Sequence, residues 1–86
     1  MGKLEKLLNK AQSSPQNLRF EEFCTLIKYF DAKLRKQPGS HRVFKREEKP
    51  RFTISVQDVN GMAKPYQVNQ FINKLLELGL LKEGEE

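Results

Sequence analysis

Residues 32–56, AKLRKQPGSHRVFKREEKPRFTISV, decide the fold, because apolar and polar side chains alternate along much of their length. A period of two is typical of strands that bury one face of a sheet. Two breaks, QPG at 37–39 and EEKP at 47–50, divide the stretch into runs joined by tight turns. The stretch therefore predicts a three-stranded antiparallel meander with strands at 32–36, 40–46 and 51–56.

The last of these runs indicates which side of the sheet is buried. Its apolar residues share one side of the strand, which we expect to face helices: Phe52, Ile54 and Val56. The alternate positions would place basic and hydroxyl groups on the other, open face: Arg51, Thr53 and Ser55.

Helical periodicity flanks the strand region on both sides. We expect an amphipathic helix over residues 3–12 and a more apolar one from Phe20. After a turn at 60–61, Pro65 suits the first position of a third helix, which Gly79 would cap. The order α-α-β-β-β-α predicts an α+β fold of two layers, with the helices on one face of a three-stranded sheet.

Chain length and composition limit what the protein can be. Its 86 residues suffice for one domain, which we assign to 1–86 with an α-β-β-β-α core at 20–81. One cysteine excludes an internal disulfide, and one cysteine with one histidine supplies too few ligands for a zinc site. We therefore expect no metal and no cofactor. Cys24 lies among apolar residues at helical spacing, which favours a buried core thiol.

The sequence carries no recognisable membrane or export signal. No apolar run approaches the roughly 20 residues of a membrane span. The N-terminal stretch MGKLEKLLNK is charged throughout and lacks the apolar core of a signal peptide. We therefore expect a cytoplasmic protein that does not associate with membranes.

Basic residues are concentrated in the strand region. The chain has 16 Lys and Arg against 11 Asp and Glu, a net charge of +5. Residues 33–51, here called the basic segment, hold eight basic and two acidic side chains, so they account for the whole excess. A concentrated basic patch favours a polyanionic partner. Charge alone is equally compatible with a solvated surface.

The segment Gly39-Ser40-His41-Arg42-Val43-Phe44 carries the side chains best suited to chemistry. A glycine permits a turn at positive φ, and a serine hydroxyl can bond a phosphate or orient an imidazole. An imidazole takes and gives protons near neutral pH, and Arg42 and Lys45 could hold a scissile phosphate. RNA brings its own nucleophile, the 2′-hydroxyl, so no metal is needed. By itself, a lone histidine on a strand is more often an ordinary half-buried residue.

The same segment resembles a known family. Residues 39–44, the basic strand before them and the Lys64-Pro65 helix start after them resemble the HicA (YcfA) family of toxin ribonucleases, over about residues 18–80. The stretch AKPYQV at 63–68 is similar to a sub-branch with an additional N-terminal helix. The resemblance implies a fold like that of double-stranded-RNA-binding domains, metal-independent cleavage of mRNA, and a HicB-like antitoxin as partner.

The resemblance also implies the site residues. The family's catalytic histidine corresponds to His41, and the Gly and Ser of its motif correspond to Gly39 and Ser40. Many relatives have a second histidine directly afterwards, where this chain has Arg42, which could substitute as a phosphate contact. The residues expected to seat the phosphate are Gly39, Ser40, Arg42 and Lys45. Those expected to hold the RNA backbone are Lys33, Arg35, Lys36 and Arg51.

Two rival functions remain open. A non-catalytic RNA-binding module of the same fold would recognise A-form shape and phosphates, and it would need no histidine. A protein-interaction domain could instead dock its basic strands on an acidic partner. Replacing His41 separates an enzyme from a binding module, and negligible RNA affinity at physiological salt would favour the interaction domain.

Overall fold

The computed structural model describes residues 2–81 of the chain. Its helices are α1 (Lys3–Ser13), the short 3₁₀ helix η1 (Pro15–Asn17), α2 (Phe20–Lys28) and α3 (Pro65–Leu78). Its strands are β1 (Ala32–Lys36), β2 (His41–Arg46), β3 (Phe52–Val59) and β4 (Met62–Ala63). The strands follow one another between α2 and α3, so the expected order of helices and strands is confirmed in outline.

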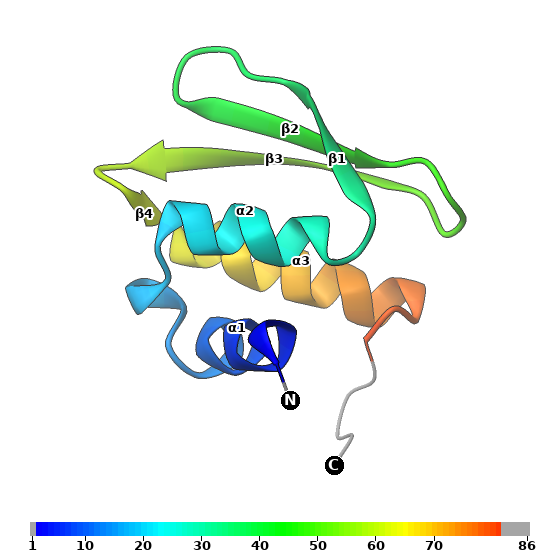
Figure 1. Ribbon diagram of the computed structural model, residues 1–86, viewed down its shortest axis with the longest axis horizontal. Coiled ribbons are helices and arrows are strands. Elements are labelled where there is room, and N and C mark those ends of the chain that lie inside the picture. The colour runs from blue at the N-terminus through cyan, green and yellow to red at the C-terminus, as the bar shows by residue number, and fades with distance from the viewer. Residues whose placement is uncertain (1, 82–86) are drawn as a thin grey trace.

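The strands form one antiparallel sheet with the helices on one side of it. The spatial order is β1-β2-β3-β4, the order along the chain, and the other side of the sheet is uncovered (Figure 1). We call this uncovered side the open face. Phe52 and Val56 are buried, whereas Thr53 and Ser55 are exposed. The register expected for the last run is therefore confirmed.

The expectation of three strands was wrong, because β4 adds a fourth. It pairs with β3 through Asp58–Ala63 and Val59–Met62. Between the two strands, Asn60 and Gly61 have φ values of 54° and 83°. Two positive φ angles are the mark of a type I′ hairpin turn, which Asn-Gly favours. The turn was expected, but β4 has only two residues, which is too short a run to show alternation.

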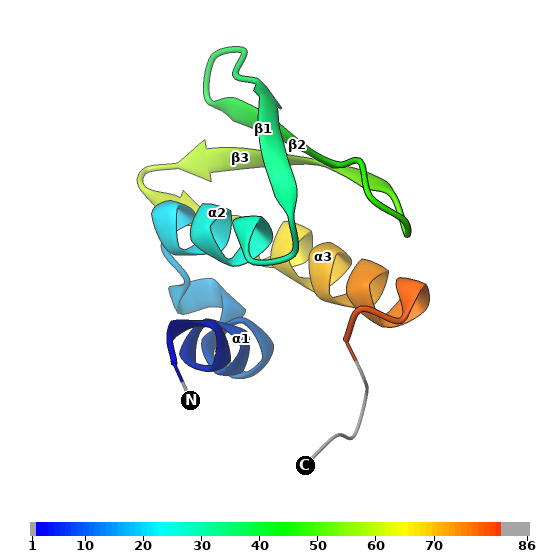
Figure 2. The ribbon, with the colours of Figure 1, turned by 45° about the vertical axis from the view of Figure 1, so that its right-hand side comes forward.

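The helices form two layers rather than one. α2 and α3 cover the sheet, and α1 packs against their far side (Figures 1 and 2). Leu7 and Ala11 are the buried residues of α1. Lys10 Nζ lies 3.0 Å from Glu22 Oε1 of α2. That carboxylate also accepts a hydrogen bond from the Arg19 N–H, and this bond and the Lys10 charge lower the pKa of Glu22. The structure thus has one layer more than expected.

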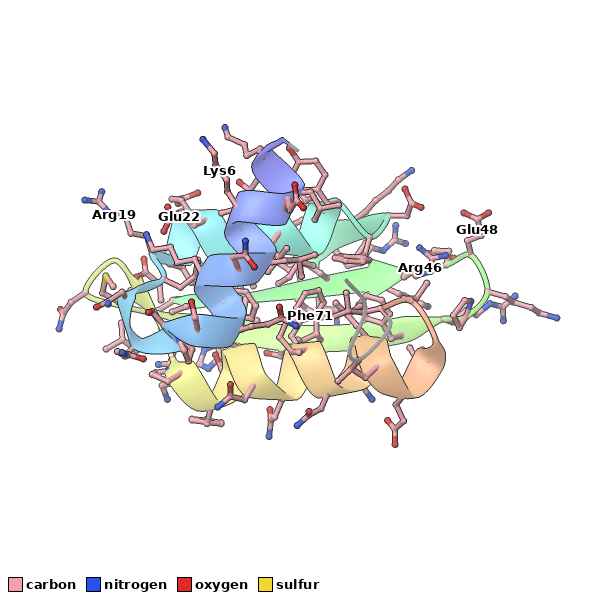
Figure 3. The ribbon with its side chains drawn as sticks, turned by 90° about the horizontal axis from the view of Figure 1, so that it is seen from below. Lys6, Arg19, Glu22, Arg46, Glu48 and Phe71 are labelled. Carbon is pink, nitrogen blue, oxygen red and sulfur yellow. The ribbon has the colours of Figure 1, made fainter. Side chains whose placement is uncertain are left out.

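Phe71 of α3 lies at the centre of the core (Figure 3). Its ring contacts Phe23, Phe30 and Phe52 edge-to-face, with centroids 5.8, 6.0 and 6.1 Å away. Such arrangements are the favoured geometry for aromatic pairs. The partners come from α2, the turn after it and β3, so one residue of α3 joins the helix layer to the sheet. The core therefore lies wholly on the helix side.

Candidate functional site

The Gly39-Ser40-His41 motif forms the turn between β1 and β2. Gly39 has a φ of 60°, a value that side-chain-bearing residues rarely adopt. No atom lies within 4 Å of the position that a Cβ on Gly39 would take, so the glycine is needed for its backbone angle and not for space. The His41 N–H donates a hydrogen bond to the Pro38 carbonyl at 3.0 Å and closes the turn. His41 is thereby the first residue of β2, and it is exposed.

His41 lies directly opposite Gln57 of β3. The next pair is hydrogen-bonded, because the Asp58 N–H donates to the Ser40 carbonyl at 2.9 Å. The His41–Gln57 pair is therefore of the non-hydrogen-bonded kind, in which facing side chains approach most closely. Gln57 Nε2 lies 3.4 Å from Ser40 Oγ. Ser40, His41 and Gln57 thus form one polar group at the end of the sheet, here called the His41 cluster.

Gln67, in the first turn of α3, holds the His41 cluster from the helix side. Gln67 is 9% exposed, and its Oε1 accepts a hydrogen bond from the Gln57 N–H at 2.9 Å. In a non-hydrogen-bonded pair, the N–H groups point away from the partner strand. The Gln57 N–H therefore makes no bond to β2, and the Gln67 side chain is its acceptor instead. Neither Gln57 nor Gln67 was expected as a site residue. Gln67 lies inside the AKPYQV stretch, whereas nothing in the sequence marks Gln57.

Lysines of β1 and β2 share the open face with His41. His41, Val43 and Lys45 are alternate residues of β2, so their side chains point the same way. Lys33 pairs with Lys45, and Lys36 pairs with Val43. The structure therefore brings three of the expected RNA contacts, Lys33, Lys36 and Lys45, onto the face that carries the imidazole.

Arg35 and Arg51 are joined by their common contact with Glu47. An Arg35 terminal nitrogen lies 3.6 Å from the Glu47 carboxylate. Arg51 Nε donates a hydrogen bond to the Glu47 carbonyl at 3.0 Å. Glu47 directly follows β2 at the end opposite His41. These two arginines consequently extend the basic surface away from the His41 cluster.

Arg42 points to the opposite face of the sheet from His41. One terminal nitrogen of its guanidinium lies 3.6 Å from Cys24 Sγ, and the other lies 3.5 Å from the Glu21 carboxylate. The guanidinium carbon is 5.0 Å from the centre of the Phe20 ring. Cys24 is buried as expected, and burial raises the pKa of its thiol although the nearby guanidinium opposes this. The structure does not bring Arg42 to the His41 cluster, because neighbouring residues of a strand face opposite ways.

Arg46 also faces the interior. It is 7% exposed, and its guanidinium donates to the carbonyls of Phe30 at 2.6 Å and Pro50 at 2.9 Å. Figure 3 shows it near the turn that carries Glu48. Of the eight cations in the basic segment, Arg42 and Arg46 thus turn toward the helices. The other six are exposed: Lys33, Arg35, Lys36, Lys45, Lys49 and Arg51.

Residues 2–81 contain no group of three or more His, Cys, Asp or Glu side chains arranged to hold a metal ion. Asp58, the acidic residue nearest to His41 in the sheet register, accepts a hydrogen bond from the Gly61 N–H at 2.7 Å. Its carboxylate therefore takes part in the β3–β4 turn. None of the helices in the described part of the chain combines the length and the apolar character that a membrane span requires.

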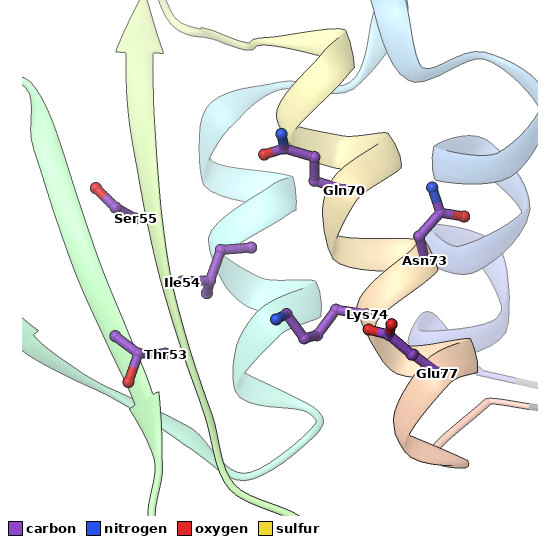
Figure 4. Close-up of a pocket in the computed structure, with 7 residues that line it drawn as sticks. All are labelled: Thr53, Ile54, Ser55, Gln70, Asn73, Lys74 and Glu77. Carbon is purple, nitrogen blue, oxygen red and sulfur yellow. The ribbon is translucent and has the colours of Figure 1, made fainter.

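A groove of about 520 Å³ lies beside the open face, between β3 and α3 (Figure 4). We call it the β3–α3 groove. Its lining residues are Thr53, Ile54, Ser55, Gln70, Asn73, Lys74 and Glu77. His41 does not line the groove, so the groove is separate from the His41 cluster. The two are neighbours nonetheless, because Thr53 and Ser55 belong both to the groove and to the open face.

Comparison with known proteins identifies the family. A family model described as HicA toxin of bacterial toxin-antitoxin matches residues 20–80. No curated protein and no solved structure gives a match. The matched residues begin with α2, include the Gly39-Ser40-His41 turn and all four strands, and end just after α3. Because this match covers most of the chain, the protein belongs to the HicA toxin family of bacterial toxin–antitoxin systems.

Proposed function

We propose that this protein is the toxin of a toxin–antitoxin pair and that it cleaves mRNA as a metal-independent endoribonuclease. His41 would be the catalytic residue. One observation carries the proposal. The single histidine of the chain is exposed at the edge of an uncovered, lysine-rich sheet face, and it does not pack in the core. A structural histidine would not need that position.

The chemistry requires two proton transfers. The 2′-oxygen of the RNA loses a proton and attacks the adjacent phosphorus, while the bond from phosphorus to the 5′-oxygen breaks. The 5′-oxygen then gains a proton, leaving a 2′,3′-cyclic phosphate and a free 5′-hydroxyl. An imidazole can take the first proton as a general base or supply the second as a general acid. His41 would perform one transfer, and water would perform the other, because the chain has no second histidine.

The open face would bind the RNA backbone. Lys36 and Lys45 share the face of His41 and would neutralise the phosphates nearest to the cleaved bond. The Gly39 backbone and the Ser40 hydroxyl would seat the scissile phosphate at the turn. Three further cations would hold the chain of phosphates beyond it: Lys33, Arg35 and Arg51. Arg42 would act only indirectly, by holding β2 against α2.

Membership of the family implies an antitoxin partner. We propose a HicB-like antitoxin that covers the open face. Such a partner would have to present acidic groups there, because six exposed cations lie in the basic segment. By occupying the same lysines as RNA, it would block substrate binding and cleavage together.

A non-catalytic RNA-binding module is the second candidate. One observation favours it: the His41 cluster contains a single imidazole, accompanied by an amide and a hydroxyl. Electrostatic binding of an RNA backbone needs only the lysines. This candidate predicts RNA affinity that does not depend on His41 and no cleavage by the parent protein.

Expression in bacterial cells decides between the two candidates. The parent protein, His41→Ala and Asn69→Ala would be induced separately, and growth and bulk mRNA integrity would be followed. Asn69 is exposed on α3 and lies outside the site, so it is the matched control. We expect the parent and Asn69→Ala to arrest growth and degrade mRNA, and His41→Ala to do neither. Equal effects of the parent and His41→Ala on mRNA would contradict the proposal.

A further inference from the structure

We propose that the β3–α3 groove binds an unpaired nucleobase of the RNA, next to the bond that His41 would cut, and thereby sets the base preference of cleavage. This inference rests on the proposed function and adds substrate recognition to it. Three features of the groove support it: a free strand edge, a polar helix wall and a position beside the His41 cluster.

The edge of β3 that borders the groove has unpaired main-chain groups. The Asp58 N–H donates to the carbonyl of Ser40, the residue just before β2, and hydrogen-bonding direction alternates along an antiparallel strand. Thr53 and Ser55, which are odd-numbered, therefore direct their N–H and C=O groups away from β2 and toward the groove. Within residues 2–81, no hydrogen bond to these outward groups is found.

Neighbouring positions on the same edge are already occupied. β4 pairs with Asp58 and Val59, and the Gln67 side chain accepts the N–H of Gln57. The free edge is thus limited to Thr53 and Ser55. Two peptide groups that present both donors and acceptors match the edge of a base, which carries both kinds of group.

α3 supplies the opposite wall with polar side chains. Gln70 and Lys74 extend from the helix toward β3 (Figure 4). Asn73 and Glu77 complete the helix wall, and the charges of Lys74 and Glu77 offset each other. A wall without net charge does not favour a phosphate, whereas the open face with its lysines does. Amide and ammonium groups are among the side-chain groups that recognise base edges.

The groove lies one step along the sheet from the His41 cluster. His41 is opposite Gln57, and Val43 is opposite Ser55. Alternate residues of a strand are about 7 Å apart, so Ser55 is a short distance from the residue that faces the imidazole. When the scissile phosphate of an RNA strand lies at His41, an adjacent base thus reaches the groove by turning over the edge of β3.

A nucleobase fits the β3–α3 groove better than a polypeptide strand does. The groove volume of about 520 Å³ is within the range of small-molecule sites, about 300–1,000 Å³. Strand addition needs a run of free main-chain groups with pockets for alternate side chains. The free edge has only two such positions. Ile54 is the one apolar residue among those that line the groove, and it is half-buried under the sheet.

The test uses a single-stranded RNA library with randomised bases, incubated with the full-length protein. The variants are Gln70→Ala and Lys74→Ala, with Asn69→Ala as a control on the same helix but outside the groove lining. Sequencing of the new 5′ ends gives the base preference beside the cut. We expect both groove variants to cut RNA while the preferred base loses its advantage by roughly 5–150-fold, the range of a good base contact. Asn69→Ala should keep the parental preference.

Each outcome separates the inference from the proposed function. If the parent cleaves and both groove variants keep its base preference, the nucleobase assignment is wrong and the proposed function stands. If the parent binds the library without cutting it, the proposed function fails. The inference is then tested on the bound RNAs: a base that the parent enriches and the groove variants do not would support it, and equal enrichment by all of them would overturn it. Groove variants that alter antitoxin binding or self-association, but not base preference, would assign the groove to a polypeptide strand and overturn the inference.

Discussion

The side-chain oxygen of Gln67 lies 2.9 Å from the backbone nitrogen of Gln57 and accepts its hydrogen bond. Gln57 is the residue directly opposite His41 in the sheet. A buried amide of α3 therefore fixes the strand position that faces the histidine on the open face. Through this bond, the helix layer supports the His41 cluster from the covered side of the sheet.

Gln67→Ala should slow RNA cleavage while leaving RNA affinity unchanged. The substitution frees the Gln57 N–H and loosens the strand opposite His41, and small misplacements of reacting groups cost up to about 100-fold in rate. We expect kcat to fall about tenfold or more with little change in KM. Gln67→Glu keeps an acceptor oxygen and should recover part of the loss. Identical kinetics for both variants would show that the hydrogen bond has no role in positioning.

Arg46→Ala should destabilise the fold by about 3 kcal/mol, because it leaves the partly buried carbonyls of Phe30 and Pro50 without their charged donor. Arg51→Ala is the matched control, since Arg51 is exposed and makes one hydrogen bond to a backbone carbonyl. It should change the free energy of unfolding by no more than about 0.5 kcal/mol. Urea denaturation of the two variants measures both values. Equal losses would mean that Arg46 does not secure the end of the sheet.

RNA binding should weaken steeply with salt. With roughly four phosphate contacts from the open face, log affinity should fall against log salt with a slope of about −3 for single strands. Lys45→Ala should make this slope shallower by about 0.7, the change expected for the loss of one phosphate contact. Arg42→Ala should leave the slope unchanged, because this guanidinium contacts α2. Filter-binding titrations at several salt concentrations provide the slopes, and a flat response in the parent would contradict backbone binding by the lysines.

Cleavage should persist in EDTA. The proton transfers proposed for His41 need no metal, and residues 2–81 provide no cluster of three or more metal ligands. Cleavage rates would be compared with and without chelator, and then after adding back magnesium or zinc. Activity that disappears on chelation and returns with a divalent ion would require a different mechanism.

Alternation along residues 32–56 was enough to predict three strands and the buried side of β3, because packing against helices imposes a period of two. The same alternation already separates Arg42 from His41, although the contiguous motif suggested a shared site. β4 was missed because two residues show no period, and the stacking of α1 behind α2 depends on contacts that periodicity does not specify.

The His41 cluster was predictable only in part. The motif indicated the turn and the exposed histidine, and the Gly39 backbone angle explains why that turn needs glycine. Gln57 and Gln67 come together because β3 and α3 meet in three dimensions, and neither carries a chemical signature that marks it in the chain. The β3–α3 groove was not predictable from the sequence either. It exists because β4 pairs with Asp58 and Val59 alone and leaves the rest of the β3 edge free.

The central claim, that His41 performs proton transfer at RNA, is tested most directly by a cleavage time course on the parent protein and His41→Ala. Removing a general acid–base group typically costs about 10²–10⁴-fold in rate. Stability should change by no more than about 0.5 kcal/mol, since the side chain is exposed, and RNA affinity should be preserved because the lysines remain. We therefore predict a folded variant that binds RNA and cuts it at least 100-fold more slowly. A variant that cuts RNA as fast as the parent would contradict the claim.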